Sequence, residues 1–280
     1  MNDSLQYDLS ATPAVDRLET IAIRRLQKYE PPEGYYLAFS GGKDSIVILE
    51  LARRAGVKFD AHYSQTTVDP PEVQKYIKEH HPEVIWEKPR NSMFRLIAKK
   101  KMLPTRIIRY CCAELKEIGG RGRIVVIGVR WAESVNRRDR EVYEESRSTP
   151  GKWFLSPIID WTDEHIWDYI HARHLPYCSL YDEGKKRIGC IMCPMQGPKG
   201  MLQDAERYPK YYKAYLKAIS KLMDVLAADG RSLGHGDTPE EIMYWWIHNQ
   251  DADASTIQTE LELLDPPEVD GGIEIYPSHA

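Results

Sequence analysis

The stretch from residue 35 to residue 49 constrains the fold more than any other part of this chain. It reads YYLAFSGGKDSIVIL: an apolar run long enough for one buried strand, then Ser-Gly-Gly, then the start of a helical pattern. The two glycines allow a tight turn that brings backbone N–H groups close to an anion, and the following helix points its positive end at the same place. The sequence therefore predicts a phosphate-binding loop between a strand and a helix.

The polar side chains of this loop strengthen that prediction. Lys43 supplies a cation, and two serines supply hydroxyl donors. Asp44 places a carboxylate beside the phosphates, which makes sense mainly if a Mg²⁺ ion lies between them. The spacing is not that of a Walker A loop, because Gly-x-x-x-x-Gly-Lys is missing. The residues that we expect to bind the phosphates are Ser40, Gly41, Gly42, Lys43, Asp44 and Ser45.

Strands and helices alternate along the first two thirds of the chain. The periodicity predicts strands over 35–39, 58–64, 84–87, 124–128 and 153–157, and helices over 14–29, 46–55, 71–81, 91–101, 162–173, 208–226 and 239–249. Strands separated by helical patterns imply right-handed crossovers and a mostly parallel sheet. We therefore predict an α/β fold, a Rossmann-like sheet with flanking helices and a C-terminal helical extension. We expect 130–147 to form a surface loop, Asn91 to cap a helix, and His80 and His81 to lie at a solvated helix end.

Three loops rich in polar chemistry each follow a predicted strand. They are 40–45, 64–72 and 128–138, and in a parallel sheet such loops meet at the edge formed by the carboxyl ends of the strands. Gly128 ends a buried strand, so we expect Arg130 to emerge at this crevice and to act on substrate. Asp69 either holds a second Mg²⁺ position or only starts a helix as part of Asp-Pro-Pro; the sequence leaves both readings open.

Length and charge set the organisation of the chain. With 280 residues we expect an N-terminal helix over 1–32, an α/β domain over 33–200, C-terminal helices over 201–250 and an acidic, partly disordered tail over 251–280. The tail has no Lys or Arg, so the body of a chain with net charge −4 is itself positive, which leaves a local basic face open. We expect no signal peptide, no membrane span and a cytoplasmic location.

Five cysteines form two pairs and one remainder. Cys111 and Cys112 are adjacent, and Cys190 and Cys193 form a Cys-x-x-Cys pair flanked by Gly and Pro. Four thiolates fit a tetrahedral Zn²⁺ or an iron–sulfur cluster, and adjacent cysteines suit the separate iron corners of a 4Fe–4S cluster better than one zinc. Incidental buried thiols are the third reading. Cys178 is left over, as a persulfide carrier or, as we favour, a packed loop thiol.

Several motifs resemble those of one family. Arg-Tyr-Cys-Cys-Ala-Glu-Leu-Lys over 109–116 resembles the double-cysteine motif of iron–sulfur adenylyl-sulfate reductases, and Pro-Ile-Ile-Asp-Trp-Thr over 157–162 resembles their Trp-Thr helix start. Gly-Cys-Ile-Met-Cys-Pro over 189–194 is similar to their second ligand loop, and Gly-Val-Arg over 128–130 to their basic loop. The resemblance covers roughly 35–194 and is to the phosphoadenosine phosphosulfate (PAPS) reductase family, of the adenine-nucleotide α-hydrolase-like superfamily. It implies a 4Fe–4S cluster on Cys111, Cys112, Cys190 and Cys193.

Two departures from that family change the expected chemistry. No cysteine follows Cys193, so the C-terminal nucleophile of those reductases is missing, whereas Lys43 and Asp44 are kept, as in ATP-using PP-loop pyrophosphatases. The combination resembles the iron–sulfur ATP pyrophosphatases of DNA phosphorothioation and, more loosely, iron–sulfur tRNA thiolases. It implies an enzyme that binds ATP and Mg²⁺ and adenylates an acceptor for sulfur transfer, with Lys43, Asp44 and Arg130 as catalytic residues.

The same resemblance implies partners for the enzyme, and two alternative functions stay open. A nucleic-acid acceptor is favoured, with a sulfur donor such as a cysteine desulfurase, and the chain is a candidate homodimer. One rival is a reductase of adenylyl sulfate or PAPS that releases sulfite. The other is a non-enzymatic subunit that binds a nucleotide and a cluster.

Overall fold

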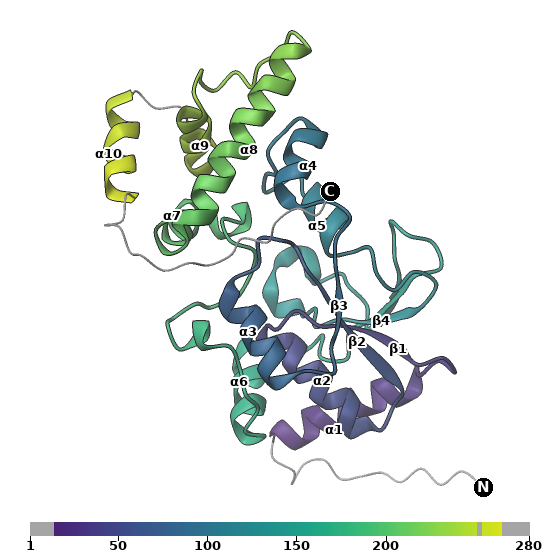
Figure 1. Ribbon diagram of the computed structural model, residues 1–280. Coiled ribbons are helices and arrows are strands. Elements are labelled where there is room, and N and C mark those ends of the chain that lie inside the picture. The colour runs from purple at the N-terminus through teal and green to yellow at the C-terminus, as the bar shows by residue number, and fades with distance from the viewer. Residues whose placement is uncertain (1–13, 251–253, 265–280) are drawn as a thin grey trace, which may run out of the picture. The chain divides into compact units, whose positions relative to one another are not determined.

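The computed structural model describes residues 14–250 and 254–264, which fall into two compact units (Figure 1). The sheet unit comprises Met1–Arg90 and Cys112–Gly189, and the helical unit comprises Asn91–Cys111 and Cys190–Ala280. Residues 91–111 and 190–200, which the sequence predicts to be part of the α/β domain, fall in the helical unit.

The sheet unit is built on one six-stranded sheet. Its strands are β1 (Tyr35–Ala38), β2 (Phe59–Ser64), β3 (Ile85–Glu87), β4 (Ile124–Val126), β5 (Tyr143–Glu145) and β6 (Trp153–Leu155). Their order is β3-β2-β1-β4-β6-β5, and every neighbouring pair is parallel except β5–β6. The mostly parallel α/β sheet predicted from the sequence is therefore confirmed. Because β2, β1 and β4 are parallel neighbours, the three chemistry-rich loops follow strands at one edge.

The prediction of a plain loop over 130–147 is wrong. The structure has two 3-10 turns there, η2 (Trp131–Glu133) and η3 (Val135–Arg137), followed by β5. The three residues of β5 pair antiparallel with β6. Their strand state depends on that tertiary pairing, because three residues are too few to show a period of their own.

Four helices pack in the sheet unit: α1 (Ala14–Lys28), α2 (Lys43–Ala55), α3 (Pro71–His80) and α6 (Asp163–Ala172). In Figure 1, α1, α2 and α6 gather on one side of the sheet, and they contact one another. Helix α2 ends as predicted, with Gly56 in the left-handed conformation at φ 69°. The Thr162 hydroxyl caps α6 by accepting a hydrogen bond from the His165 amide.

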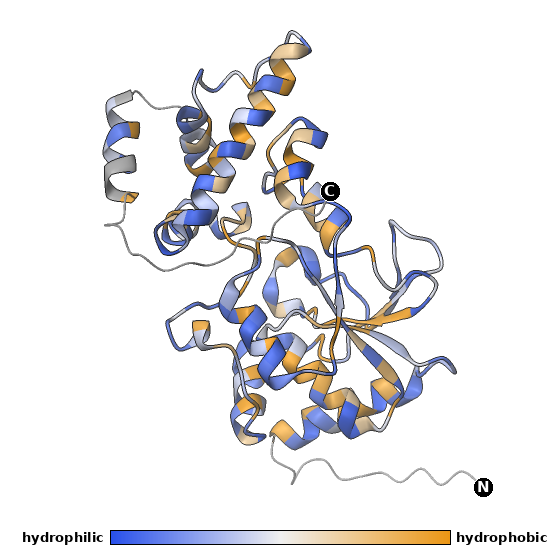
Figure 2. Ribbon diagram, in the orientation of Figure 1, coloured by the Kyte–Doolittle hydropathy of each residue, from blue (hydrophilic) through white to orange (hydrophobic). Residues whose placement is uncertain are grey.

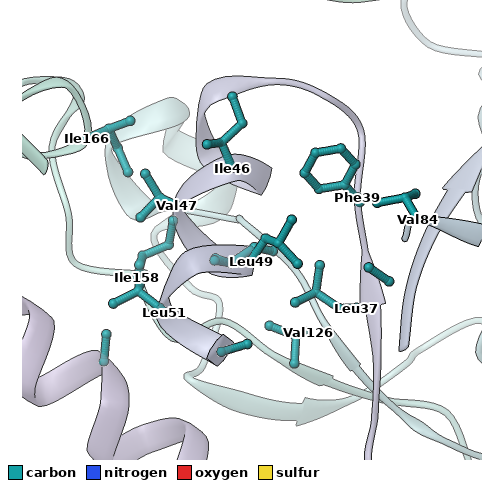
Figure 3. Close-up of a cluster of buried hydrophobic side chains, with 14 of the residues drawn as sticks. Leu37, Phe39, Ile46, Val47, Leu49, Leu51, Val84, Val126, Ile158 and Ile166 are labelled. Carbon is teal, nitrogen blue, oxygen red and sulfur yellow. The ribbon is translucent and has the colours of Figure 1, made fainter. Parts of the chain in front are cut away.

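Helix α2 packs between the sheet and helices α1 and α6. Figure 3 shows Leu49 facing Leu37 and Val126 of adjacent strands, while Val47 faces Ile166 on another side of the helix. All five side chains are fully buried. Burial on more than one side explains the continuous apolar run of 46–49, and it fixes the start of α2 relative to the end of β1.

The opposite face of the sheet carries a polar network. Tyr36 stacks on His62 with ring centroids 4.1 Å apart, and its hydroxyl donates to Glu87 at 3.0 Å. Arg123 donates to Asp60 at 2.7 Å, and this hydrogen bond lowers the pKa of the Asp60 carboxyl although partial burial opposes it. Only one face of the sheet is therefore part of the apolar core.

The helical unit contains α4 (Met93–Lys100), α7 (Gly197–Arg207), α8 (Pro209–Ala228), α9 (Pro239–His248) and α10 (Ala254–Leu264). Helix α5 (Tyr110–Leu115) begins in this unit. Helix α8 contacts α4, α7 and α9, and its buried residues recur at helical spacing. Figure 2 shows hydrophobic and hydrophilic residues interleaved along this helix. The cap of α4 is Ser92, whose hydroxyl accepts from the Arg95 amide at 3.2 Å, and not Asn91 as predicted.

Two further expectations differ from the structure. His81 is 4% exposed and lies 2.8 Å from the Tyr76 hydroxyl, so it is not solvated; burial lowers the pKa of its imidazole. Part of the acidic tail is helical, because α10 packs on α9 and the Ile257 side chain is buried. The rest of the tail lies outside the described residues. No described helix has the length and apolarity needed to span a membrane.

Candidate functional site

The loop between β1 and α2 has the backbone that the sequence predicts. Gly41 has φ 72°, and a Cβ there would lie 2.9 Å from Val73 of α3, so both conformation and space require glycine. Gly42 precedes the first residue of α2 and, as a glycine, has no side chain of its own to cap this end of the helix. The first amides of α2 are therefore directed toward whatever anion occupies the loop.

The two serines of the loop hold its shape. The Ser45 hydroxyl donates to the Gly42 carbonyl at 2.8 Å, and the Ser40 hydroxyl donates to Ser45 at 3.2 Å. The Gly42 amide donates to the Ser40 hydroxyl at 3.3 Å. The loop is thus organised by its own side chains before any ligand binds.

Arg130 lies within this site and is only 2% exposed. Its Nε donates to Asp44 at 2.6 Å, its Nη2 donates to Asp163 at 2.6 Å, and its Nη1 donates to the Trp161 carbonyl at 3.2 Å. A buried guanidinium requires such partners, since an unpaired buried charge is strongly destabilising. The arginine that we expect at the crevice therefore joins the start of α2 to the start of α6.

Lys43 completes a cluster of two cations and two carboxylates. Its ammonium lies 3.4 Å from Asp163, and the side chain is nearly as buried as that of Arg130. Partial burial raises the pKa of the Asp163 carboxyl, but the Arg130 hydrogen bond and the Lys43 charge outweigh it and hold that pKa below its usual range. The cluster is electrically balanced around one carboxylate that both cations share.

Gly128 allows the sheet to approach the loop closely. A Cβ at this position would lie 2.8 Å from Cβ of Asp44 and 3.2 Å from its carbonyl carbon. Gly128 therefore contributes to the site by leaving room for Asp44, because any larger residue would push β4 away from the start of α2.

The segment before Cys190 contacts Lys43 twice. The Lys43 amide donates to the Tyr181 hydroxyl at 2.9 Å, and its ammonium donates to the Lys186 carbonyl at 3.1 Å. Burial raises the pKa of the Tyr181 hydroxyl above its usual range, so this phenol is neutral. A neutral hydroxyl therefore accepts the hydrogen bond of the Lys43 amide, which a bound phosphate oxygen would otherwise accept.

Asp69 is engaged in its own loop. Its two carboxylate oxygens accept hydrogen bonds from the Thr66 amide at 2.6 Å and the Thr66 hydroxyl at 2.8 Å, and the side chain is buried. Of the two readings left open by the sequence, this arrangement favours the organisation of the turn that leads into α3.

Cys178 is 1% exposed and belongs to the core of the sheet unit. Its charge contributes to the raised pKa of Tyr76 and of Tyr181, after burial, so the thiol lies near both phenols. This surrounding agrees with a packed thiol rather than an accessible sulfur carrier.

The Cys-x-x-Cys loop of the helical unit is a defined turn. Residue Met192 has the left-handed backbone conformation, with φ 56°. Its amide donates to the buried Asp204 carboxylate at 2.9 Å. Gln196 donates to the Cys190 carbonyl at 3.2 Å and to Asp204 at 2.7 Å. Asp204, on α7, therefore holds the loop that carries the second cysteine pair.

The charges of three candidate ligand thiols act on one phenol, that of Tyr215. Burial raises the pKa of the Tyr215 hydroxyl, and the charges of Cys190, Cys193 and Cys111 raise it further. The fourth, Cys112, follows Cys111 in α5, so successive side chains there point about 100° apart around the helix axis. Over the described residues, no group of three or more His, Cys, Asp or Glu side chains is arranged to hold a metal ion.

Sequence reasoning missed four residues that shape these sites. Asp163 and Tyr181 lie far from the loop in the sequence, and only the packing of their segments brings them to Lys43. Asp204 and Tyr215 lie on helices whose patterns show only a core face. Only Asp163 had a signal in the sequence, because it is an acidic residue in the first turn of the helix that follows the Trp-Thr motif.

One protein-family profile and several curated proteins are similar to this chain. The sequence profile of the phosphoadenosine phosphosulfate reductase domain matches residues 34–196, more than half of the chain. An uncharacterized protein of Methanocaldococcus jannaschii is 27% identical over 222 residues, which cover 75% of this chain and 45% of that protein. The chain spans about half the length of the first two curated relatives that it matches.

Two other relatives carry the names of enzymes. An adenosine 5'-phosphosulfate reductase of Geobacillus kaustophilus is 29% identical over 168 residues, 56% of this chain and 71% of that protein. A protein of Caenorhabditis elegans named "Probable FAD synthase" is 26% identical over 208 residues, 72% of this chain and 38% of that protein.

Tyr181→Phe tests whether the phenol competes with an anion for the loop. The change frees the Lys43 amide, so we expect inorganic pyrophosphate to bind several-fold more tightly by isothermal titration calorimetry. Tyr177→Phe is the matched control, because it removes a hydroxyl of the same segment that bonds to Asp182. Weaker pyrophosphate binding by Tyr181→Phe alone would show instead that the hydroxyl itself binds the anion.

Proposed function

This chain belongs to the phosphoadenosine phosphosulfate reductase domain family, and on that premise we propose that it is an ATP pyrophosphatase that adenylates an acceptor for sulfur transfer. Family members named above are enzymes that act on adenine nucleotides. The observation that carries the proposal is the pairing of Lys43 and Arg130 through Asp163 at the N-terminus of α2.

The loop fits the β,γ-pyrophosphate of ATP better than a sulfonucleotide. It offers the backbone amides of a helix start, a buried ammonium and a second buried cation within one cluster. Adenylyl sulfate and PAPS carry no β,γ-pyrophosphate to use these groups. The contacts of Lys43 with Asp163 and Lys186 are those that the incoming phosphates would replace.

In the proposed reaction, the residues of the site bind ATP and stabilise the pyrophosphate that leaves. An oxygen of the acceptor forms a bond to the α-phosphorus, and the bond from that phosphorus to the bridging oxygen of the β-phosphate breaks. The electron pair leaves with pyrophosphate, whose charge Lys43 and the loop amides stabilise, and any acceptor proton passes to solvent. Arg130, positioned by three hydrogen bonds, offsets charge at the α-phosphate.

Asp44 and Asp163 are the carboxylates that would hold Mg²⁺ in this site. Oxygen ligands of this kind suit the ion, which keeps phosphate oxygens and water in its remaining positions. When bound, Mg²⁺ would neutralise charge on the phosphates. In the structure both carboxylates accept from Arg130 instead.

Sulfur enters in the second half of the reaction. A donor such as a cysteine desulfurase carries sulfur as a persulfide. A thiol reductant cleaves that persulfide, forming a disulfide and releasing hydrosulfide, which displaces AMP from the adenylated acceptor. We favour a nucleic acid as the acceptor. Cys178 is too buried to carry this sulfur.

We also propose one 4Fe–4S cluster on Cys111, Cys112, Cys190 and Cys193. The donor set suits such a cluster: all four are cysteine sulfurs, and burial together with the charges of three of them raises the pKa of the Tyr215 hydroxyl. With four cysteine ligands, each iron corner would be capped by protein, so the cluster would crosslink the Cys-x-x-Cys loop to the start of α5. The donor set and its spacing carry this part of the proposal, because no finished metal site is present among the described residues.

The two rivals make different demands on the chain. A reductase of adenylyl sulfate or PAPS needs a thiol nucleophile beyond the cluster ligands, and Cys178, 1% exposed, is the one cysteine left. A non-enzymatic subunit would bind ATP and a cluster without releasing pyrophosphate.

Lys43→Ala tests the nucleotide site. Charge-assisted contacts to phosphate contribute roughly 1.5–3 kcal/mol each, so we expect ATP with Mg²⁺ to bind about 10- to 150-fold more weakly by calorimetry. The fold should persist, because Arg130 still pairs with Asp163. Lys75→Ala, which removes an exposed lysine of α3, is the control. Equal ATP affinity in the two variants would refute this site.

Anaerobic purification tests the cluster. The protein should be brown and contain about four irons per chain. Cys193→Ala should lose the iron, whereas Cys178→Ala, which removes a thiol outside the ligand set, should keep it. A colourless protein with one zinc per chain would contradict the proposal.

A further inference from the structure

A shallow groove of about 650 Å³ lies on the sheet unit beside the Arg130 turn. Its lining residues are Trp131, Ala132, Ser134, Val135, Arg138 and Asp160. Trp131 follows Arg130 directly, so the groove lies on the outer side of the turn whose inner side reaches Asp44. Its volume is in the range of small-ligand sites.

The groove exposes an aromatic surface that is rigidly held. Trp131 is 39% exposed, yet its amide donates to the Ile159 carbonyl at 2.7 Å and its Nε1 donates to the Arg140 carbonyl at 2.8 Å. Both polar groups of this residue are therefore satisfied within the protein. Val135 beside it is 71% exposed. The exposed ring can therefore stack on a ligand without breaking any hydrogen bond of Trp131.

The charge of the groove is positive and comes from one residue. Asp160 is neutralised by Arg25, whose two terminal nitrogens donate to its two oxygens at 2.7 Å and 2.9 Å. The guanidinium of Arg138 is exposed and makes no hydrogen bond or ion pair with any part of the chain that the structure describes. Asp139, the next residue, does not line the groove. One unpaired cation thus stands beside an exposed indole.

We propose that this groove binds the acceptor and that the acceptor is a single-stranded segment of nucleic acid. One base stacks on Trp131, the adjacent phosphate pairs with Arg138, and Ser134 supplies a hydroxyl to the backbone. Stacking on an aromatic ring together with a cation on the phosphate is the general mode of single-strand binding. The proposal rests on the proposed function, because it gives the acceptor site of that reaction.

Fluorescence anisotropy with labelled single strands of about 12 nucleotides, one of DNA and one of RNA, tests the groove on the full-length, anaerobically purified protein. We expect Trp131→Ala to weaken binding about 10-fold and Trp131→Phe to retain most of it. Arg138→Gln should weaken binding and reduce the slope of log affinity against log salt by about 0.7. Arg147→Gln removes an exposed arginine outside the groove and should change neither value.

Three outcomes would overturn the assignment. The wild-type protein could fail to bind either strand, or Trp131→Ala and Arg138→Gln could bind as the wild type does. The third is that Trp131→Ala converts a dimer to a monomer in sedimentation velocity with unchanged oligonucleotide affinity, which would make the groove a protein interface. ATP affinity, measured in parallel, separates this failure from that of the proposed function, because these variants leave Lys43 and its partners intact.

Discussion

The buried guanidinium of Arg130 is the interaction on which the rest of the site depends. A charge that is 2% exposed must be paired, and its partners come from two separate segments: Asp44 at the start of α2, and Asp163 and the Trp161 carbonyl at the start of α6. Gly128 makes this approach possible by leaving room for Asp44. The ends of β1 and β4 and the start of α6 are thus held in one geometry.

That geometry also sets the chemistry. Two cations share Asp163, so phosphates that displace this carboxylate meet Lys43 and Arg130 together. The Tyr181 hydroxyl accepts from the Lys43 amide and the Lys186 carbonyl from its ammonium, so both buried donors are hydrogen-bonded. The same turn carries Trp131 on its outer side. One loop therefore links the proposed nucleotide site to the proposed acceptor site.

Local pattern predicted much of this arrangement. The strand, Gly-Gly turn and helix over 35–55, the Gly56 cap and the Thr162 cap all follow from short-range rules, and the parallel order of β2, β1 and β4 put Arg130 beside the loop. What could not be predicted depends on packing between distant segments. Tyr181 reaches Lys43 from 138 residues away, and His81 is buried by its contacts with Tyr76 and Phe39.

The central claim is that the nucleotide is ATP and that its β,γ-pyrophosphate occupies the loop at Lys43. Direct titration of the intact, anaerobically purified protein with ATP, adenylyl sulfate and PAPS tests it most directly. The account predicts that ATP with Mg²⁺ binds most tightly and that neither sulfonucleotide yields sulfite in the presence of a thiol. Tighter binding of adenylyl sulfate or PAPS, accompanied by thiol-dependent release of sulfite, would contradict it.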